Sequence, residues 1–198
     1  MLAQWQRDGG YAGDIDPDHE LAWFLLPLQE RVGDLWHSGR ISIALEHYVT
    51  SQIEQKLYAA MNQLPVAEFG AKVVVACPPG EKHDIAALAV AYRCRVRGCR
   101  VYYLGANVPI SSLSRLCREV APDLAILSLT LVLQEGNAAE LIHSLAEELK
   151  PVTTVMAGGH GARVMRDQLA QYRIDVLDTF SELDEVLDRF TRRFTIPG

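Results

Sequence analysis

The chain has 198 residues, of which 49% are hydrophobic and 22% charged. This composition is typical of one folded domain or two small ones, and it excludes general disorder. Nineteen basic and twenty-five acidic residues give a net charge of −6 with no basic run. The chain is therefore a poor candidate for binding a nucleic-acid backbone.

The longest apolar stretches, such as Leu124–Leu133, have about half of the roughly 20 residues that a membrane helix needs. The N-terminal sequence lacks the basic start and apolar run of a signal peptide. The four cysteines form no CxxC pair, so neither a zinc site nor a disulfide framework is indicated. These features predict a cytoplasmic protein without a membrane segment.

Residues 1–18 lack periodicity and are interpreted as a tail. Apolar residues then recur at helical spacing from His19 to Trp36, with Pro27 as an expected kink, and Ser38-Gly39 ends this helix. Ser42 is expected to cap a second helix, whose apolar stripe Val49, Ile53, Leu57, Ala60 and Leu64 begins with Glu46. Residues 19–64 are thus predicted to form a helical cap, followed by a linker at 65–71.

From residue 72 to 198 the pattern changes to alternating strands and helices. Strands are predicted at 72–77, 100–105, 124–131, 153–159 and 174–178, and helices at about 83–97, 110–120, 136–149, 161–172 and 181–193. Nearly all-apolar strands that alternate with helices indicate a parallel sheet covered on both faces. We therefore predict an α/β fold, a five-stranded doubly wound sheet with flavodoxin-like strand order.

Ligands of such sheets bind beyond the carboxyl ends of the strands. The loops there contain Glu81 and His83 after the first strand, Gly105 after the second, Ser128 and Thr130 near the end of the third, and Gly158-Gly159 at the end of the fourth. The chain has neither a GxGxxG after the first strand nor a GxxxxGK[ST]. The sequence therefore speaks against a dinucleotide-binding site and against a P-loop nucleotide site.

A lone histidine at a helix start, such as His83, often has no special role. Here, however, Glu81 lies two residues before His83, and Ser128 is expected on the neighbouring strand. A metal-binding histidine usually donates its second ring N–H to a carboxylate. One histidine cannot build a zinc or iron site, although it can supply an axial bond to a metal held by a macrocycle. Gly158-Gly159 either lets the strand turn into a helix or permits close approach of a flat group.

The run Glu81-Lys82-His83-Asp84-Ile85-Ala86, with Ser128 and Gly158-Gly159 downstream, resembles the D/E-x-H-x-x-G, S-x-L and GG motif of cobalamin-binding domains. The resemblance implies that His83 is the lower cobalt ligand and that Glu81 and Ser128 form its relay. It also implies that Gly105, Ser128, Thr130, Gly158 and Gly159 line the channel of the nucleotide tail. Ala86 and Thr130 depart from the motif.

In the cap, Trp36-His37 and Glu46-His47 resemble the W-x9-EH signature of cobalamin-dependent photoreceptors of the CarH type. Taken singly, Trp36 would be a core aromatic and Glu46-His47 a solvated helix start. The resemblance, which covers roughly residues 20–195, implies that Trp36 and Glu46-His47 line the pocket of the adenosyl group. It also implies that His37 becomes the upper cobalt ligand after light, giving a bis-histidine pair with His83.

The resemblance therefore implies a light-responsive regulatory sensor, not an enzyme, with adenosylcobalamin as cofactor. Residues 1–64 have room for two long helices where a full cap has about four, and a MerR-like DNA-binding domain is missing. We accordingly expect a stand-alone sensor or a fragment that does not itself bind DNA and acts through homo-oligomers or an effector protein. The resemblance also leaves open a bilin as second chromophore, which the sequence neither indicates nor excludes.

Two alternatives stay open. A corrinoid carrier of a methyltransferase system would share the cap, the sheet and the lower ligand, although Trp36-His37, Glu46-His47 and Ala86 speak against it. A flavodoxin-like signalling domain without cobalamin would leave His83 without a role. A mutase subunit is disfavoured because the chain lacks a substrate barrel.

Overall fold

A computed structural model describes residues 25–194 of the chain. The chain divides into two compact units, Met1–Gln55 and Lys56–Gly198, so that the boundary falls inside helix α4. Each unit is described by itself below.

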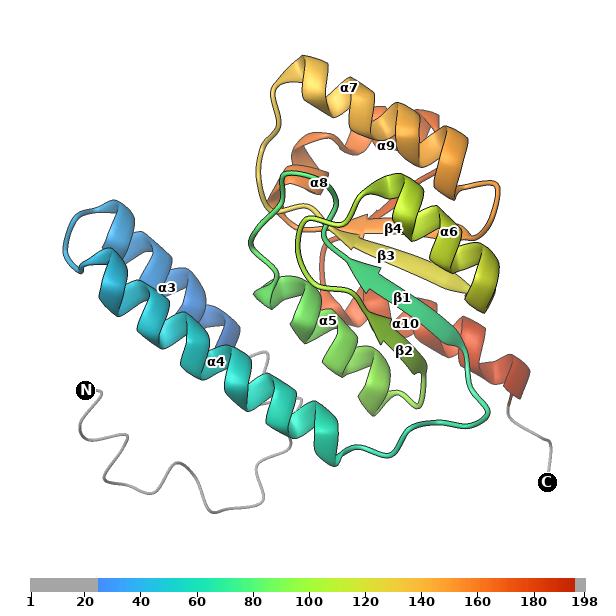
Figure 1. The fold of residues 1–198 in the computed structure, drawn as a ribbon, viewed down its shortest axis with the longest axis horizontal. Helices are drawn as coiled ribbons and strands as arrows, with labels where there is room; N and C mark the ends of the chain where they lie inside the picture. Colours follow the sequence, from blue (N-terminus) through green and yellow to red (C-terminus); the bar gives the residue numbers. More distant parts are fainter. Residues whose placement is uncertain (1–24, 195–198) are drawn as a thin grey trace. The chain divides into compact units, whose positions relative to one another are not determined.

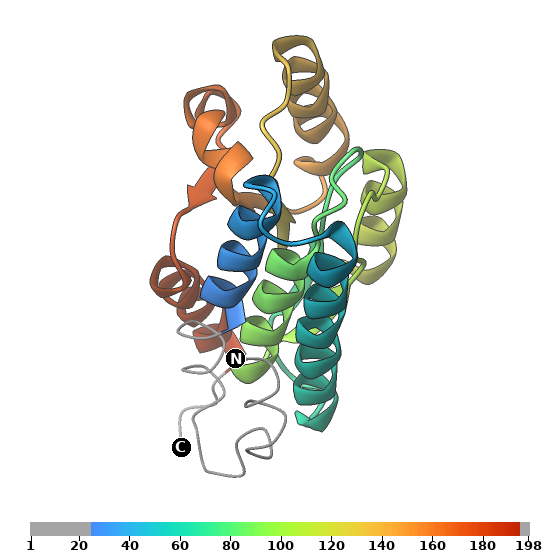
Figure 2. The same ribbon diagram turned by 90° about the vertical axis from the view of Figure 1, so that its left-hand side faces the viewer.

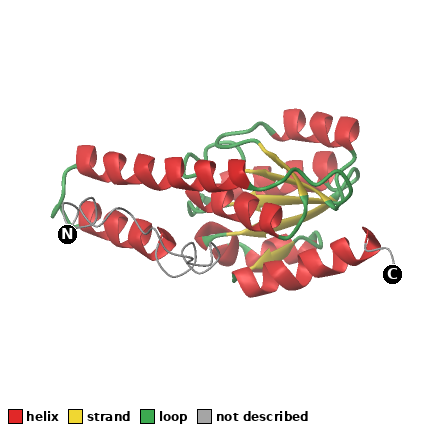
Figure 3. Cartoon of the chain, turned by 90° about the horizontal axis from the view of Figure 1, so that it is seen from below, coloured by secondary structure: helices red, strands yellow, loops and turns green. Residues whose placement is uncertain are grey.

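The first unit contains an antiparallel helical hairpin (Figure 3). Helix α3 spans Leu26–His37 with Pro27 in its first turn, where the missing N–H costs no hydrogen bond. The part of this helix predicted before Leu25, including the segment on the N-terminal side of the expected kink, lies outside the described residues. The helix ends where predicted, because Ser38 is the C-cap and Gly39 follows with φ of +69°.

Helix α4 spans Ile43–Gln63. The hydroxyl of Ser42 accepts a hydrogen bond from the backbone N–H of Leu45 at 3.2 Å, which confirms Ser42 as its cap. The predicted stripe is also present, since Val49, Ile53 and Leu57 are buried. The other members of the stripe, Glu46, Ala60 and Leu64, are half-buried.

The second unit is built on a five-stranded parallel sheet with strand order β2-β1-β3-β4-β5 (Figure 1). The strands are β1 (Lys72–Ala76), β2 (Arg100–Tyr103), β3 (Leu124–Ser128), β4 (Thr154–Gly158) and β5 (Asp175–Leu177). Every neighbouring pair is parallel. The doubly wound, flavodoxin-like α/β fold predicted for this part of the chain is therefore confirmed.

The helices between the strands are α5 (Ile85–Val96), α6 (Ile110–Val120), α7 (Glu135–Ser144), α8 (His160–Val164), α9 (Arg166–Gln171) and α10 (Phe180–Thr191). A π-helical stretch, η2 (Leu145–Leu149), continues α7, and a 3-10 turn, η3 (Arg192–Phe194), continues α10. The predicted helix 161–172 is two short helices, because the chain turns at Met165.

Alternate strand residues face two separate cores. One core contains Val74, Ala125 and Leu127 and is covered by α6, α7 and α9. The other contains Val73, Val75 and Ile126 and is covered by α5 and α10. In Figure 2, α6 and α7 lie apart from α5 and α10, in agreement with the two cores. All five residues of β3 are buried, as expected for a central parallel strand.

Several predicted boundaries differ at the carboxyl edge of the sheet, and two of these differences concern the loops that carry the candidate site residues. Strand β3 ends at Ser128 instead of residue 131, and α5 begins at Ile85, so that His83 lies in the preceding loop instead of in the helix. Both differences lengthen the loops at the edge where such folds bind ligands. Among the described helices, none is long and apolar enough to cross a bilayer.

Candidate functional site

The loop of residues 78–84, between β1 and α5, is fixed to the loop that follows β2. The backbone N–H of Gly80 donates to Oδ1 of Asn107 at 2.9 Å, and the N–H of Asn107 donates to the carbonyl oxygen of Glu81 at 2.9 Å. Gly80 has φ of +84°, a conformation that glycine adopts without strain. Hydrogen bonds between the two loops thus hold the segment that carries Glu81 and His83.

The Glu81 side chain is buried, at 3% exposure for the residue, and its two carboxylate oxygens have different partners. Oε1 accepts hydrogen bonds from the backbone N–H of His83 at 2.9 Å and from Nδ1 of its ring at 2.8 Å. Oε2 accepts the backbone N–H groups of Thr130 and Leu131, both at 2.7 Å. The carboxylate therefore joins the loop after β1 to the loop after β3.

Burial by itself would raise the pKa of the Glu81 carboxyl. The backbone N–H groups of His83, Leu131 and Thr130 and the His83 ring outweigh this effect and lower the pKa below its usual value. Glu81 is therefore ionised at neutral pH and acts only as an acceptor, so Nδ1 of His83 carries the hydrogen.

In the neutral imidazole, the opposite nitrogen of His83, Nε2, then keeps its lone pair. The side chain is 63% exposed, against 4% for that of Glu81, so the ring reaches outward from a buried anchor. A carboxylate that orients an imidazole in this way fixes its tautomer and raises its basicity as a metal ligand. His83 thus presents one nitrogen that would suit coordination of a metal held by a macrocycle, so the pair fits a cofactor of that kind.

Ser128 and Cys77 lie behind the His83 loop, at the ends of adjacent strands. Ser128 is buried, and its hydroxyl interacts with the Cys77 thiol, whose Sγ also lies 3.7 Å from the carbonyl oxygen of His83. Burial, with added contributions from the Asp84 and Glu81 charges, raises the pKa of Cys77 to about 12. The thiol therefore stays protonated and contacts the His83 backbone, a contact that no motif in the sequence predicts.

The glycine pair at the end of β4 is explained by close approach of backbone. A Cβ on Gly159, which has φ of +101°, would lie 2.5 Å from the carbonyl oxygen of Leu129. A Cβ on Gly158 would lie 3.3 Å from the carbonyl oxygen of Leu177. Gly161 is equally constrained, since its Cβ would lie 2.1 Å from the carbonyl oxygen of Leu131. These neighbours are protein backbone: Gly159 and Gly161 lie against the loop after β3, and Gly158 lies against β5.

Gly105 and Thr130 share this carboxyl edge. Gly105 has φ of +74°, and its carbonyl oxygen accepts the backbone N–H of Cys77 at 2.9 Å. Thr130 is half-buried and contributes its backbone N–H to Glu81. The site residues predicted on the sheet are thus brought to one edge, with Ser128 and Gly158 paired in register on β3 and β4.

The first unit carries the other predicted residues. The rings of Trp36 and His37 make an edge contact with centroids 4.5 Å apart, and both side chains are exposed. Nδ1 of His37 lies 2.9 Å from the carbonyl oxygen of Gly33. Since a carbonyl oxygen only accepts, Nδ1 donates, and Nε2 of His37 is left with a lone pair.

Glu46 is at the centre of a polar network in the hairpin. Its Oε2 lies 2.6 Å from Nδ1 of His47, and its Oε1 accepts the hydroxyl of Thr50 at 2.8 Å. Gln29 of α3 donates to the same hydroxyl at 2.9 Å. Glu46 is thereby fixed in orientation, and His47, whose side chain is 70% exposed, also has Nε2 free.

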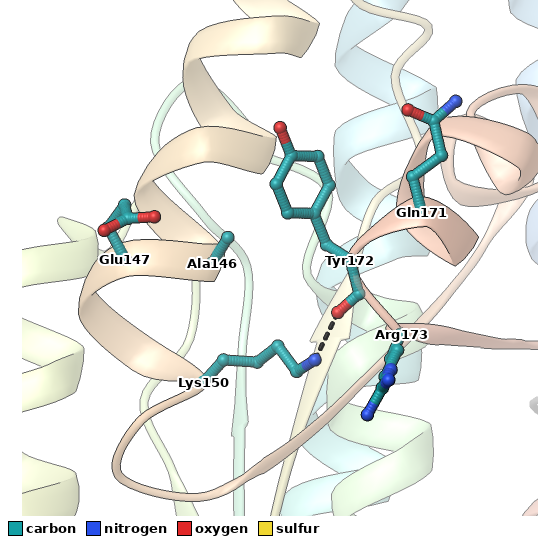
Figure 4. Close-up of a pocket in the computed structure, with 6 residues that line it drawn as sticks. All are labelled: Ala146, Glu147, Lys150, Gln171, Tyr172 and Arg173. Carbon is teal, nitrogen blue, oxygen red and sulfur yellow. Dashed lines mark hydrogen bonds between the residues drawn. The ribbon is translucent and has the colours of Figure 1, made fainter.

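Within the described residues, no three His, Cys, Asp or Glu side chains gather where they would hold a metal ion. A cavity of about 310 Å³ is lined by residues of η2 and of the segments that precede β4 and β5, among them Lys150 and Tyr172 (Figure 4). Lys150 donates to the carbonyl oxygen of Tyr172 beside it. None of the predicted site residues lines this cavity.

Comparison with protein families gives two matches. A model described as a B12 binding domain matches residues 71–189, and a second model with the same description matches residues 13–60. The first match alone covers more than half of the chain.

Three curated proteins are similar in sequence. The HTH-type transcriptional repressors CarA and CarH of Myxococcus xanthus are 31% and 32% identical over 140 and 139 residues, or 71% and 70% of this chain. The matched region spans 46% of each repressor. An uncharacterised 20.5 kDa protein in the bchF-crtJ intergenic region of Rhodobacter capsulatus is 28% identical over 88% of this chain and 92% of its own length.

Solved structures share the fold. The Methanosarcina barkeri monomethylamine corrinoid protein has a TM-score of 0.67 at 17% identity, over 93% of this chain and 86% of its own. A novel cobalamin-binding protein from Desulfitobacterium hafniense has a TM-score of 0.52 at 25% identity, over 96% of this chain and 89% of its own. With the family match over residues 71–189, the chain belongs to the B12-binding domain family.

Proposed function

We propose that this chain is a cobalamin-binding, light-responsive regulatory sensor. The observation that carries the cobalamin part is the Glu81–His83 pair, in which a buried, ionised carboxylate holds an exposed imidazole with Nε2 free. His83 is the proposed lower cobalt ligand. Bound cobalamin would supply a cobalt–carbon bond that visible light breaks.

The light response is proposed from the first unit. Trp36, Glu46 and His47 are assigned to the upper-ligand pocket, and His37, with its free Nε2, to the upper cobalt position after light. Support comes from the W-x9-EH pattern and from the similarity to the CarA and CarH repressors. An upper ligand that contacts these residues before light and not after it would shift the equilibrium between two conformations of the cap.

The proposed domains are a helical cap at 19–64, a linker at 65–71 and a cobalamin-binding domain at 72–198, after a tail at 1–18. Adenosylcobalamin is the proposed cofactor form. The proposed output is a change of assembly or of binding to an effector protein, without DNA binding by these residues, and the proposed location is the cytoplasm. Gly105, Ser128, Thr130, Gly158 and Gly159 are proposed to line the nucleotide tail.

The test is an absorption spectrum of the protein with adenosylcobalamin in darkness and after green light, with size-exclusion chromatography of both states. We expect an irreversible spectral change and a changed elution volume. His83→Ala should abolish the dark base-off spectrum, whereas the exposed helical His143→Ala is the matched control and should change nothing. Cobalamin binding without any light-linked change would instead favour a corrinoid carrier.

The role of His37 has its own test. His37→Ala should leave dark binding intact and abolish the stable light product. Formation of the same product by this variant would show that the upper ligand is another group.

A further inference from the structure

The first turn of α8 packs against the backbone of the loop after β3. A Cβ on Gly161 would lie 2.1 Å from the carbonyl oxygen of Leu131, 2.9 Å from its carbonyl carbon and 3.1 Å from the carbonyl oxygen of Leu129. The backbone N–H of Ala162 donates to the carbonyl oxygen of Leu129 at 3.2 Å. The chain at position 161 thus has room for a hydrogen and nothing larger.

The loop held in this way is the one that binds Glu81. The N–H groups of Thr130 and Leu131 both donate to Oε2 of Glu81, and Oε1 of the same carboxylate accepts Nδ1 of His83. One continuous set of contacts therefore runs from Gly161 through the backbone of residues 129–131 to the His83 ring.

We propose that Gly161 is a positioning residue for His83, acting through the Thr130 and Leu131 N–H groups and Glu81. The inference rests on the proposed function, in which His83 is the lower cobalt ligand. An alanine methyl at position 161 must push the Leu131 carbonyl away. This carbonyl belongs to the backbone and is not the movable end of a side chain. The adjoining N–H groups move with it, and their hydrogen bonds to Glu81 lengthen and lose alignment.

The first test needs no cofactor. In the wild-type protein, nitrogen NMR of labelled histidine should show the His83 ring with its hydrogen on Nδ1. Gly161→Ala should shift the ring toward a mixture of tautomers. Gly136→Ala is the matched control, because a Cβ at Gly136 meets no atom within 4 Å beyond its chain neighbours and its own helix backbone, and it should leave the tautomer unchanged. A wild-type tautomer in folded Gly161→Ala overturns the proposal.

The second test is a double-mutant cycle on cobalamin affinity, measured by absorbance titration. Gly161→Ala should weaken binding about 10-fold, the lower end of what loss of an orienting partner costs a metal ligand. In a His83→Ala background the same substitution should cause no further loss. An equal loss in both backgrounds would mean that Gly161 acts on the fold and not on His83, and would overturn the proposal.

These measurements distinguish failure of the proposed function from failure of the inference about Gly161. If His83→Ala binds cobalamin like the wild type, with the same spectrum, the proposed function fails. If His83→Ala weakens binding and Gly161→Ala does not, only the inference fails. Circular dichroism establishes that the variants are folded. Should Gly161→Ala not fold, Thr130→Pro removes one donor to Glu81 directly, and an unchanged His83 tautomer in that variant overturns the proposal.

Discussion

At the scale of single residues, Glu81 combines burial with charge. A buried carboxylate is tolerated only where hydrogen bonds replace its hydration, and Glu81 obtains them from backbone N–H groups and one imidazole. The Glu81–His83 contact was predictable, because a carboxylate two residues before a histidine is well placed to bind its ring. The N–H donors of Thr130 and Leu131 were not predictable, because backbone groups carry no sequence signal and lie about fifty residues away along the chain.

The lowered pKa of Glu81 predicts a pH dependence of stability. Because the folded-state pKa lies below the ordinary value of 4.5, ionised Glu81 stabilises the fold above that pH, and this contribution is lost as the pH falls through the folded-state pKa. Glu81→Gln should lower the free energy of unfolding at pH 7 by about 2 kcal/mol, the cost of buried donors left without an acceptor.

Urea unfolding from pH 7 to pH 3 measures this effect. The difference between the wild type and Glu81→Gln should shrink as the pH falls, and Glu147→Gln, at an exposed position on η2, should match the wild type throughout. A constant difference across the whole range would contradict the prediction.

The burial of the cysteines predicts slow alkylation of the native protein. Cys77, Cys94, Cys99 and Cys117 are all buried, and burial raises the pKa of each thiol, to about 11 for Cys99 and Cys117. Since the thiolate is the reactive form, the native protein should react with iodoacetamide at pH 8 at least 100-fold more slowly than a free thiol. In urea all four should react, and mass spectrometry counts the labels. Rapid native labelling of Cys77 would show that the His83 loop opens.

At the scale of elements, alternation of apolar strands with amphipathic helices was enough to predict all five strands and the strand order. The boundaries were less predictable where tertiary contacts compete with the local pattern. Residues 129–131 are as apolar as a strand, yet β3 ends at Ser128 because the N–H groups of Thr130 and Leu131 turn to Glu81. The break at Met165 likewise lacks a proline to mark it.

Helix α10 offers a prediction about capping. The Thr179 hydroxyl accepts the N–H of Glu182 at 3.2 Å, and the Glu182 carboxylate accepts the N–H of Asp178 at 2.8 Å, in a variant of the capping box. Thr179→Ala should lower the free energy of unfolding by about 1 kcal/mol, measured by urea denaturation. Thr179→Ser keeps the acceptor and serves as the control. Equal stability of the alanine and serine variants would show that the cap contributes nothing.

At the scale of the whole molecule, the residues proposed to bind one cofactor are divided between two units. His83 belongs to the unit of residues 56–198, whereas Trp36, His37 and Glu46 belong to the unit that ends at Gln55. Two separate motifs in the sequence relate these two sets to cobalamin. The two proposed assignments together predict that cofactor binding slows amide exchange in each unit.

Hydrogen exchange of the full chain tests this point. Addition of adenosylcobalamin in darkness should slow exchange in residues 78–84 and 129–131 and also in α3, around Trp36 and His37. Amides of α9, near the amino edge of the sheet, serve as the internal control and should be unaffected. His83→Ala should weaken protection in both units together, since loss of the lower ligand lowers occupancy of the entire site. Protection confined to residues 56–198 would remove Trp36, His37 and Glu46 from the cofactor site and, with them, the basis for a light response.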